Sequence, residues 1–221
     1  AARDTRSLEH LKSLGCDRTI PQIPDITLGL EVDKTKVAAP AKPFAAVVVN
    51  AMLLKSGSFS EADLLGLYRS ILARILGSGV DAKIVLHEPK ADRALSQELA
   101  KACGAELVSF DNPLHVKSYM SQARVVVTAR FHGLANGLSS GVPSLAGGWS
   151  HKYAELLKDF GTPDLIHSGS DETFLEKIET LLTSDEAHDR VANTLTERNA
   201  HLSGVLSNYW DELADDMMRC R

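Results

Sequence analysis

Four basic or titratable side chains gather in two short stretches of the chain. Arg130 and His132 lie two residues apart in the sequence Thr-Ala-Arg-Phe-His-Gly, and His151 and Lys152 follow a Gly-Gly-Trp-Ser sequence. Arginine binds anionic oxygens through a bidentate fork, and histidine transfers protons near neutral pH. The two stretches therefore predict a site that binds a phosphate or a carboxylate and that moves a proton.

The same residues also allow a structural interpretation. Arg130 could cap a neighbouring loop, His132 could fill a polar corner, and Gly147-Gly148 could form an ordinary turn. A lysine at the start of a helix interacts unfavourably with the helix dipole, so Lys152 is more easily explained by a role other than helix stability. However, most lysines simply lie exposed on the surface. From the residues alone, the structural and functional roles of Arg130 and His132 are equally well supported.

The elements that must position these residues alternate between extended and helical, which indicates an α/β protein with a parallel sheet. Since the clearest strands are apolar on both faces, we expect a Rossmann-like three-layer fold with helices on both faces. Strands are predicted at 45–49, 83–86, 106–108, 124–127 and 143–146, with an edge strand at 164–166. Helices are predicted at 5–14, 60–76, 92–103, 115–122, 131–140 and 151–160, and then as a polar surface pair from 171 onward with a break near 183–185.

Polar residues follow several of the predicted strands. Asn50 and His87 each come directly after one strand, and the Arg130 stretch follows another. Because ligands of open parallel sheets bind beyond the carboxyl ends of the strands, we expect these residues to line one pocket. Asn50, His87, Trp149 and His151 are thus candidates for lining the pocket or contacting a second substrate.

Composition excludes several other classes of protein. The 221 residues carry 24 Lys and Arg against 29 Asp and Glu, and only 5% are aromatic, which argues against a nucleic-acid partner. No apolar run approaches the ~20 residues of a membrane-spanning helix, and the first fifteen residues do not resemble a secretory signal. Cys16, Cys103 and Cys220 lack metal-site or redox spacing, so we expect no metal, reduced thiols and a cytoplasmic location.

Ordered motifs along the first 161 residues carry a resemblance to a known family. The most distinctive is Val-Val-Thr-Ala-Arg-Phe-His-Gly at 126–133, which leads through a helix to Gly141-Val142-Pro143 and then to Lys152. In this combination the chain resembles the polysaccharide pyruvyl transferases, which are similar in fold to GT-B glycosyltransferases. The other matching positions are Arg3-Asp4-Thr5-Arg6-Ser7, Leu14-Gly15, Pro24-Asp25, Asn50, His87, Leu156-Leu157 and Phe160-Gly161.

The resemblance implies transfer of a pyruvyl group from phosphoenolpyruvate to a sugar of a polysaccharide or glycan, which forms a ketal and releases phosphate. Phosphoenolpyruvate is then the donor substrate, and no cofactor is implied. The donor carries two anionic groups, for which Arg3, Arg130 and Lys152 are the candidate ligands, and His132 is the candidate acid and base.

The resemblance also sets the expected domain organisation. Family members usually carry a further N-terminal Rossmann-like half, so we expect residues 1–39 to be a helix and loop from the interdomain region. Residues 40–221 are then the donor-binding, C-terminal half with its C-terminal helices. Without the other half we expect weak donor binding and poor turnover.

Two other functions remain open at this point. A donor domain of a nucleotide-sugar glycosyltransferase shares this fold, but it commonly has a glutamate where Asn136 and Ser139-Ser140 stand here. A glycan-binding domain that has kept the fold and lost the reaction is the second alternative.

Overall fold

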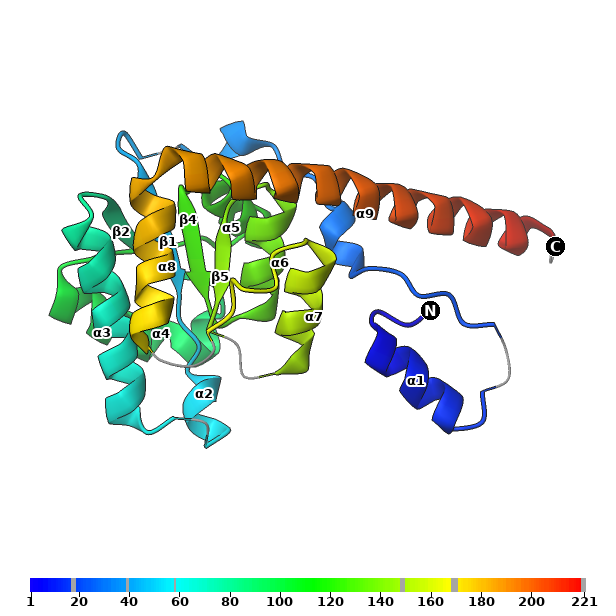
Figure 1. The fold of residues 1–221 in the computed structure, drawn as a ribbon, viewed down its shortest axis with the longest axis horizontal. Helices are drawn as coiled ribbons and strands as arrows, with labels where there is room; N and C mark the ends of the chain where they lie inside the picture. Colours follow the sequence, from blue (N-terminus) through cyan, green and yellow to red (C-terminus); the bar gives the residue numbers. More distant parts are fainter. Residues whose placement is uncertain (17–18, 39, 58, 148–149, 168–170, 220–221) are drawn as a thin grey trace.

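A five-stranded parallel sheet forms the centre of the protein (Figure 1). The structure is a computed structural model and describes residues 1–16, 19–38, 40–57, 59–147, 150–167 and 171–219. The strand order is β3-β2-β1-β4-β5. Strands β2 and β3 lie on one side of β1, and β4 and β5 lie on the other, so the strand order reverses between β1 and β4. The strands are β1 (Phe44–Val48), β2 (Asp81–Leu86), β3 (Glu106–Ser109), β4 (Val125–Thr128) and β5 (Ser144–Ala146).

The strands are apolar because helices cover both faces of the sheet. Along β1, Ala45 and Val47 belong to one buried cluster, while Phe44, Ala46 and Val48 belong to another. This alternation is the two-residue period of a strand whose two sides are both buried. The predicted three-layer α/β fold is therefore confirmed.

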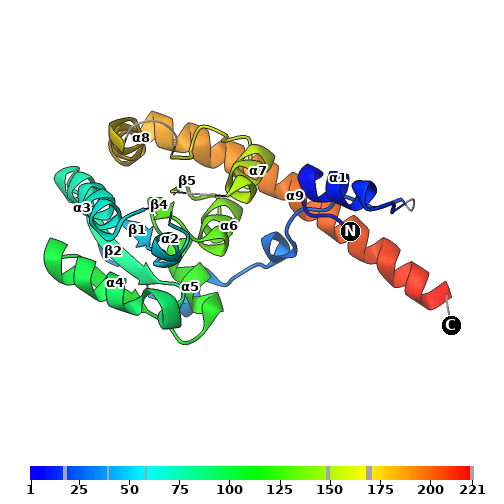
Figure 2. The same cartoon turned by 90° about the horizontal axis from the view of Figure 1, so that it is seen from below.

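Two helix pairs form the outer layers. Helices α3 and α8 pack side by side over one face of the sheet, and α5 and α6 pack together on the other (Figure 2). Helix α4 packs against α3, β2 and β3. The helices are α1 (Thr5–Ser13), α2 (Met52–Lys55), α3 (Glu61–Gly77), α4 (Pro89–Cys103), α5 (Pro113–Met120), α6 (Phe131–Ser139), α7 (His151–Asp159), α8 (Asp171–Thr183) and α9 (Asp185–Arg219), with 3-10 turns η1 (Ile26–Gly29) and η2 (Lys34–Lys36).

Several elements differ from their predicted bounds. Helices α4 and α5 begin earlier than predicted, because Pro89 and Pro113 occupy their first positions, where the fixed φ of proline suits a helix. The predicted edge strand at 164–166 is a single bridge from Ile166 to Ala146, since the preceding residues form turns. The break between α8 and α9 is confirmed, and the Ser184 hydroxyl accepts a hydrogen bond from the Ala187 amide at 3.2 Å.

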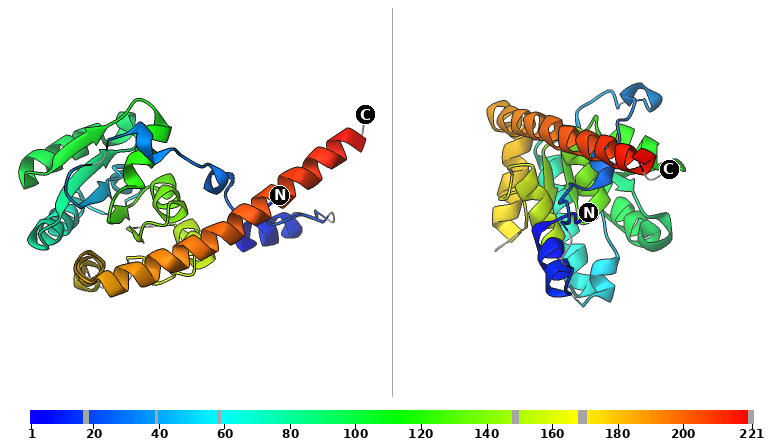
Figure 3. Two further views of the ribbon diagram at one scale, coloured as in Figure 1. Left: turned by 90° about the horizontal axis from the view of Figure 1, so that it is seen from above. Right: turned by 90° about the vertical axis from the view of Figure 1, so that its right-hand side faces the viewer.

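Helix α8 corrects the prediction of a polar surface pair. It buries Phe174, Leu175, Ile178, Leu181 and Leu182 in the larger cluster. Helix α9 packs on α8 and α6 with its first half, and its second half projects away from the sheet (Figure 3). Among the described residues, no helix combines the length and the hydropathy needed to cross a bilayer.

The N-terminal segment packs onto the sheet domain through η1 and the residues after it. Turn η1 contacts both α6 and α9. Beyond it, Lys117 of α5 donates to the Leu30 carbonyl, and Ser118 donates to the Asp33 carbonyl at 2.9 Å. At the start of the chain, Asp4 caps α1 by accepting the Ser7 amide at 2.7 Å.

Candidate active site

A cleft of about 370 Å³ lies beyond the carboxyl ends of β1, β2 and β4. These strands are neighbours in the sheet, and the reversal of strand order between β1 and β4 is where ligands of open α/β sheets bind. Six residues of the sequence prediction line it together. The full lining is Arg3, Asn50, Met52, His87, Glu88, Arg130, Phe131, His132, Lys152 and Tyr153.

Arg130 is held by a carboxylate that the sequence prediction missed. Its Nε donates to Asp92 Oδ2 at 2.9 Å and its Nη2 donates to Asp92 Oδ1 at 2.5 Å. Asp92 is only 1% exposed, and its Oδ1 also accepts the Ala51 amide at 3.0 Å. Because a buried carboxylate requires a partner, Asp92 and Arg130 fix one another at the floor of the cleft.

The pairing narrows what Arg130 can offer to a ligand. Two of its three guanidinium nitrogens bind Asp92, and the side chain is 18% exposed. Both N–H groups of Nη1 and the second N–H of Nη2 are left for a bound anion, but the charge of Arg130 is compensated by Asp92. Arg130 therefore supplies hydrogen-bond donors to the cleft rather than the uncompensated charge expected from its type.

Lys152 and Arg3 both lie close to the ring of the buried Phe131. The Lys152 ammonium lies 5.4 Å and the Arg3 guanidinium 4.8 Å from the centre of the Phe131 ring, both within range of a cation–π contact. Arg3 also pairs with Asp4 at 3.1 Å. Lys152 has no ion pair with any carboxylate of the described chain, so its charge is available to a bound anion.

The N-terminus of α6 adds backbone donors beside these cations. Arg130 occupies its N-cap position but makes no side-chain capping bond, and the Phe131 amide bonds the Tyr153 hydroxyl, so this one amide of the first turn is already used. The exposed imidazole of His132, the second residue of the helix, contacts the edge of Phe131. The helix dipole, the first-turn amides after Phe131 and Lys152 together favour an anion at this point.

Asn50 lines the cleft but uses its amide inside the protein. Its Nδ2 donates to the Ala129 carbonyl at 2.7 Å, and its Oδ1 accepts the Met52 amide at 3.0 Å. The Tyr153 hydroxyl donates to the same Ala129 carbonyl at 2.7 Å. Asn50 thus joins the ends of β1 and β4 and shapes the cleft.

His87 follows β2 and is partly buried in the cleft wall. Burial lowers the pKa of its imidazole below the ordinary 6.5, and the positive charges of His132 and Arg130 lower it further, against opposing effects of Asp92 and Glu88. The neutral form is therefore favoured at neutral pH.

The two remaining candidates do not join this group. His151 is the first residue of α7 and is exposed, and it does not line the cleft. Trp149 lies outside the described residues, as does Gly148. No group of three or more metal-ligating side chains occurs among the described residues.

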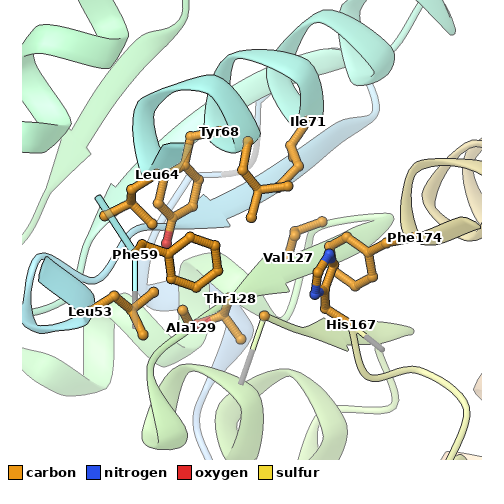
Figure 4. Close-up of a pocket in the computed structure, with 12 residues that line it drawn as sticks. Leu53, Phe59, Leu64, Tyr68, Ile71, Val127, Thr128, Ala129, His167 and Phe174 are labelled. Carbon is orange, nitrogen blue, oxygen red and sulfur yellow. The ribbon is translucent and has the colours of Figure 1, made fainter. Parts of the chain in front are cut away.

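A second cavity lies on the other side of the β4 end and is not suited to an anion. It has a volume of about 40 Å³ and is lined mainly by apolar side chains, including Leu53, Phe59 and Phe174 (Figure 4). His167 at its edge bonds Asp171 at 2.8 Å. No lysine or arginine lines this cavity, which is roughly the size of one or two water molecules.

Solved structures similar to this chain share its fold at low sequence identity. The Glycosylation Associate Protein (Gap123) complex from Streptococcus agalactiae is 13% identical, with a TM-score of 0.60 over 91% of this chain and 42% of that one. A putative UDP-N-acetylglucosamine 2-epimerase from Listeria monocytogenes is 14% identical, with a TM-score of 0.60 over 95% and 59%. MurG from Acinetobacter baumannii is 15% identical, with a TM-score of 0.51 over 95% and 63%.

These similarities identify the fold as GT-B-like, and the chain spans less than two thirds of each of the three structures. No curated protein sequence matches the chain. A family model described as polysaccharide pyruvyl transferase matches residues 1–151, which include all ten residues of the cleft except Lys152 and Tyr153. The chain therefore belongs to the polysaccharide pyruvyl transferase family.

Proposed function

We propose that the cleft binds phosphoenolpyruvate and that the chain supplies the donor site for transfer of its pyruvyl group to a sugar of a polysaccharide or glycan. The family is one of transferases. The observation that carries the proposal is the ammonium of Lys152, which has no ion pair among the described residues, beside the N-terminus of α6, where Arg130 makes no side-chain capping bond. This arrangement suits a small anion better than an extended neutral ligand.

The donor matches the cations of the cleft in number and kind. Phosphoenolpyruvate carries a phosphate and a carboxylate on a three-carbon frame, and a cleft of about 370 Å³ has room for it together with part of a sugar. Lys152 and the N-terminus of α6 offer one anion site, and Nη1 of Arg130 offers a donor for the second group. Arg3 also lines the cleft, with its charge paired to Asp4 at 3.1 Å and to Asp25 at 3.9 Å.

His132 is placed to move the proton that the reaction requires. The methylene carbon of the donor must gain a proton while a sugar hydroxyl attacks the neighbouring carbon, and phosphate must then leave. His132 lies beside the proposed anion site, and it has no hydrogen-bond partner among the described side chains. A general acid of this kind contributes about 10²–10⁴-fold to a rate.

Binding measurements test the donor directly. Calorimetric titration of the full chain with phosphoenolpyruvate should give saturable heat, and Lys152→Met should weaken binding at least ~10-fold through loss of a charged contact. Lys158→Met, an exposed lysine near the other end of α7, is the matched control and should leave binding unchanged. Heat with UDP-sugars or GDP-sugars but none with phosphoenolpyruvate would replace this proposal with a glycosyltransferase donor site.

We also propose a cytoplasmic location for the reaction. The support for this location comes from the cysteines, of which Cys16 and Cys103 are free thiols in the structure. Cell fractionation, with the protein detected by an antibody against the full chain, tests this location. The protein is expected in the cytoplasmic fraction, and its recovery in another fraction would contradict the proposal.

A further inference from the structure

His87 is a histidine of the cleft to which the proposed chemistry assigns no role. It directly follows β2, whereas His132 is the second residue of α6, the helix that follows β4, and β1 lies between these two strands. Because β2 and β4 are two inter-strand spacings apart, their backbones are separated by about 10 Å. The two imidazoles therefore reach one cleft from different elements, close enough for the charge of His132 to lower the pKa of His87.

The ring of His87 is free to act on a ligand. Neither of its nitrogens has a hydrogen-bond partner among the described residues, and the side chain is partly buried in the cleft wall. No described protein group therefore fixes the ring or occupies its nitrogens. A partly buried imidazole without a protein partner in a substrate cleft is suited to accept a proton from a ligand.

When the donor is bound in the cleft, the charges close to His87 differ from those close to His132. His87 faces Arg130 from the β4–α6 turn, His132 from α6, Asp92 from α4 and its neighbour Glu88. Burial and the two cationic neighbours favour neutral His87. The proposed donor site at the N-terminus of α6 lies beside His132, the second residue of that helix, whereas His87 reaches the cleft from the end of β2.

We propose that His87 is the general base that takes the proton of the attacking sugar hydroxyl, while His132 is the acid that protonates the donor. This inference rests on the proposed function. It divides acid and base between two histidines with different surroundings, which is how enzymes run both kinds of proton transfer in one site.

The proton balance closes with these two groups. The first hydroxyl oxygen bonds to the central carbon of phosphoenolpyruvate, its proton passes to His87, and imidazolium His132 gives a proton to the methylene carbon. The bond from the central carbon to the phosphate oxygen then breaks with its electron pair leaving on phosphate, which takes the proton from His87. The second hydroxyl bonds to the same carbon and returns a proton to His132, so both histidines are reset.

Histidine NMR on the full chain tests the inference without an acceptor sugar. Ring signals of His87 and His132 are assigned with His87→Gln and His132→Gln and titrated with pH, with and without phosphoenolpyruvate. We expect His87 to titrate below 6.5 without the donor, and the ring signals of His132 to shift when the donor is added. Titration of His87 above pH 7 in the donor complex would overturn its role as base.

Kinetics provide the second test, with phosphate release measured from phosphoenolpyruvate and a panel of methyl hexopyranosides. His87→Gln should lower kcat at least ~100-fold, leave KM for the donor unchanged and remove the acid limb of the pH profile. His201→Gln, an exposed histidine of α9, is the control. An unchanged kcat in His87→Gln would overturn only the role of His87 as base. If calorimetry detected no heat of binding between the wild-type protein and phosphoenolpyruvate, the donor assignment would be overturned, and this inference with it. Should no glycoside of the panel react, the NMR titration decides.

Discussion

Asp92 is the residue on which the position of Arg130 depends. Replacing it with Asn keeps the shape but removes the charge that compensates the guanidinium, so Asp92→Asn should lower the free energy of unfolding by about 2–3 kcal/mol. Urea denaturation measures this loss. The control is Asp81→Asn, whose carboxylate is half exposed and pairs with Lys83 at 3.8 Å, and which should change stability by under ~0.5 kcal/mol. Equal midpoints for the two variants would contradict the role of Asp92.

The lowered pKa of His87 links stability to pH. Between the pKa of His87 in the folded protein and its ordinary value of 6.5, the unfolded chain binds more protons than the folded chain. The free energy of unfolding is therefore at its full value above pH 6.5 and falls as the pH drops through that window. His87→Gln cannot titrate there and should lose less stability between pH 7.5 and pH 5.5. Urea midpoints at both pH values measure the difference, and parallel losses in the two proteins would contradict it.

The residue pattern predicts only part of the site, for physical reasons. His151 and Lys152 are neighbours in sequence, but successive residues of a helix point about 100° apart, so only one of them can face the cleft. Lys152 lines it and His151 is exposed. Asp92 is 38 residues from Arg130, and local spacing does not encode such a contact. Its one signal is a charged residue on the buried face of a helix, in register with Leu95 and Leu99.

At the scale of elements, α6 can approach the sheet because of two glycines. A Cβ on Gly137 would lie 2.1 Å from Ser144 Oγ, and one on Gly133 would lie 2.6 Å from Thr128 Oγ1. Gly137→Ala should therefore destabilise the protein by about 1–3 kcal/mol. Gly66→Ala in α3, where a Cβ meets nothing within 4 Å, should instead stabilise it by roughly 0.5–1 kcal/mol. Thermal unfolding of the two variants measures the contrast, and a gain in Tm for Gly137→Ala would refute it.

Periodicity predicts the strands and long helices well because their side chains pack with regular spacing. It fails where tertiary contacts decide the outcome. Helix α8 has a polar exposed face, but its apolar stripe covers the sheet next to α3, and a surface pair was the wrong prediction. The short helix α2 consists only of Met52–Lys55 and has no side-chain N-cap. Its sequence therefore has no periodic or capping pattern from which a helix could be predicted.

At the scale of the whole molecule, the position of Arg3 depends on contacts far away in the chain. Arg3 reaches the cleft although the nearest sheet strand begins at Phe44. The segment between them is held by η1 against α6 and α9, where Leu28 is buried and Leu206 lies 3.4 Å from the position of a Cβ on Gly29. The sequence predicts a helix and a loop in this region, but it does not show where they pack.

This packing predicts that the end of the chain affects donor binding. Leu206 is 3% exposed and belongs to the larger cluster, so Leu206→Ala should cost about 2–4 kcal/mol and loosen η1 from α9. Faster amide hydrogen exchange across 26–37 would report the loosening. Because Arg3 is carried by the same segment, binding of phosphoenolpyruvate should weaken in calorimetry, while Met217→Ala, at a residue 64% exposed on the projecting end of α9, should change neither property. Donor affinity in Leu206→Ala equal to that of the wild type, with exchange across 26–37 clearly faster, would show that the cleft does not need Arg3.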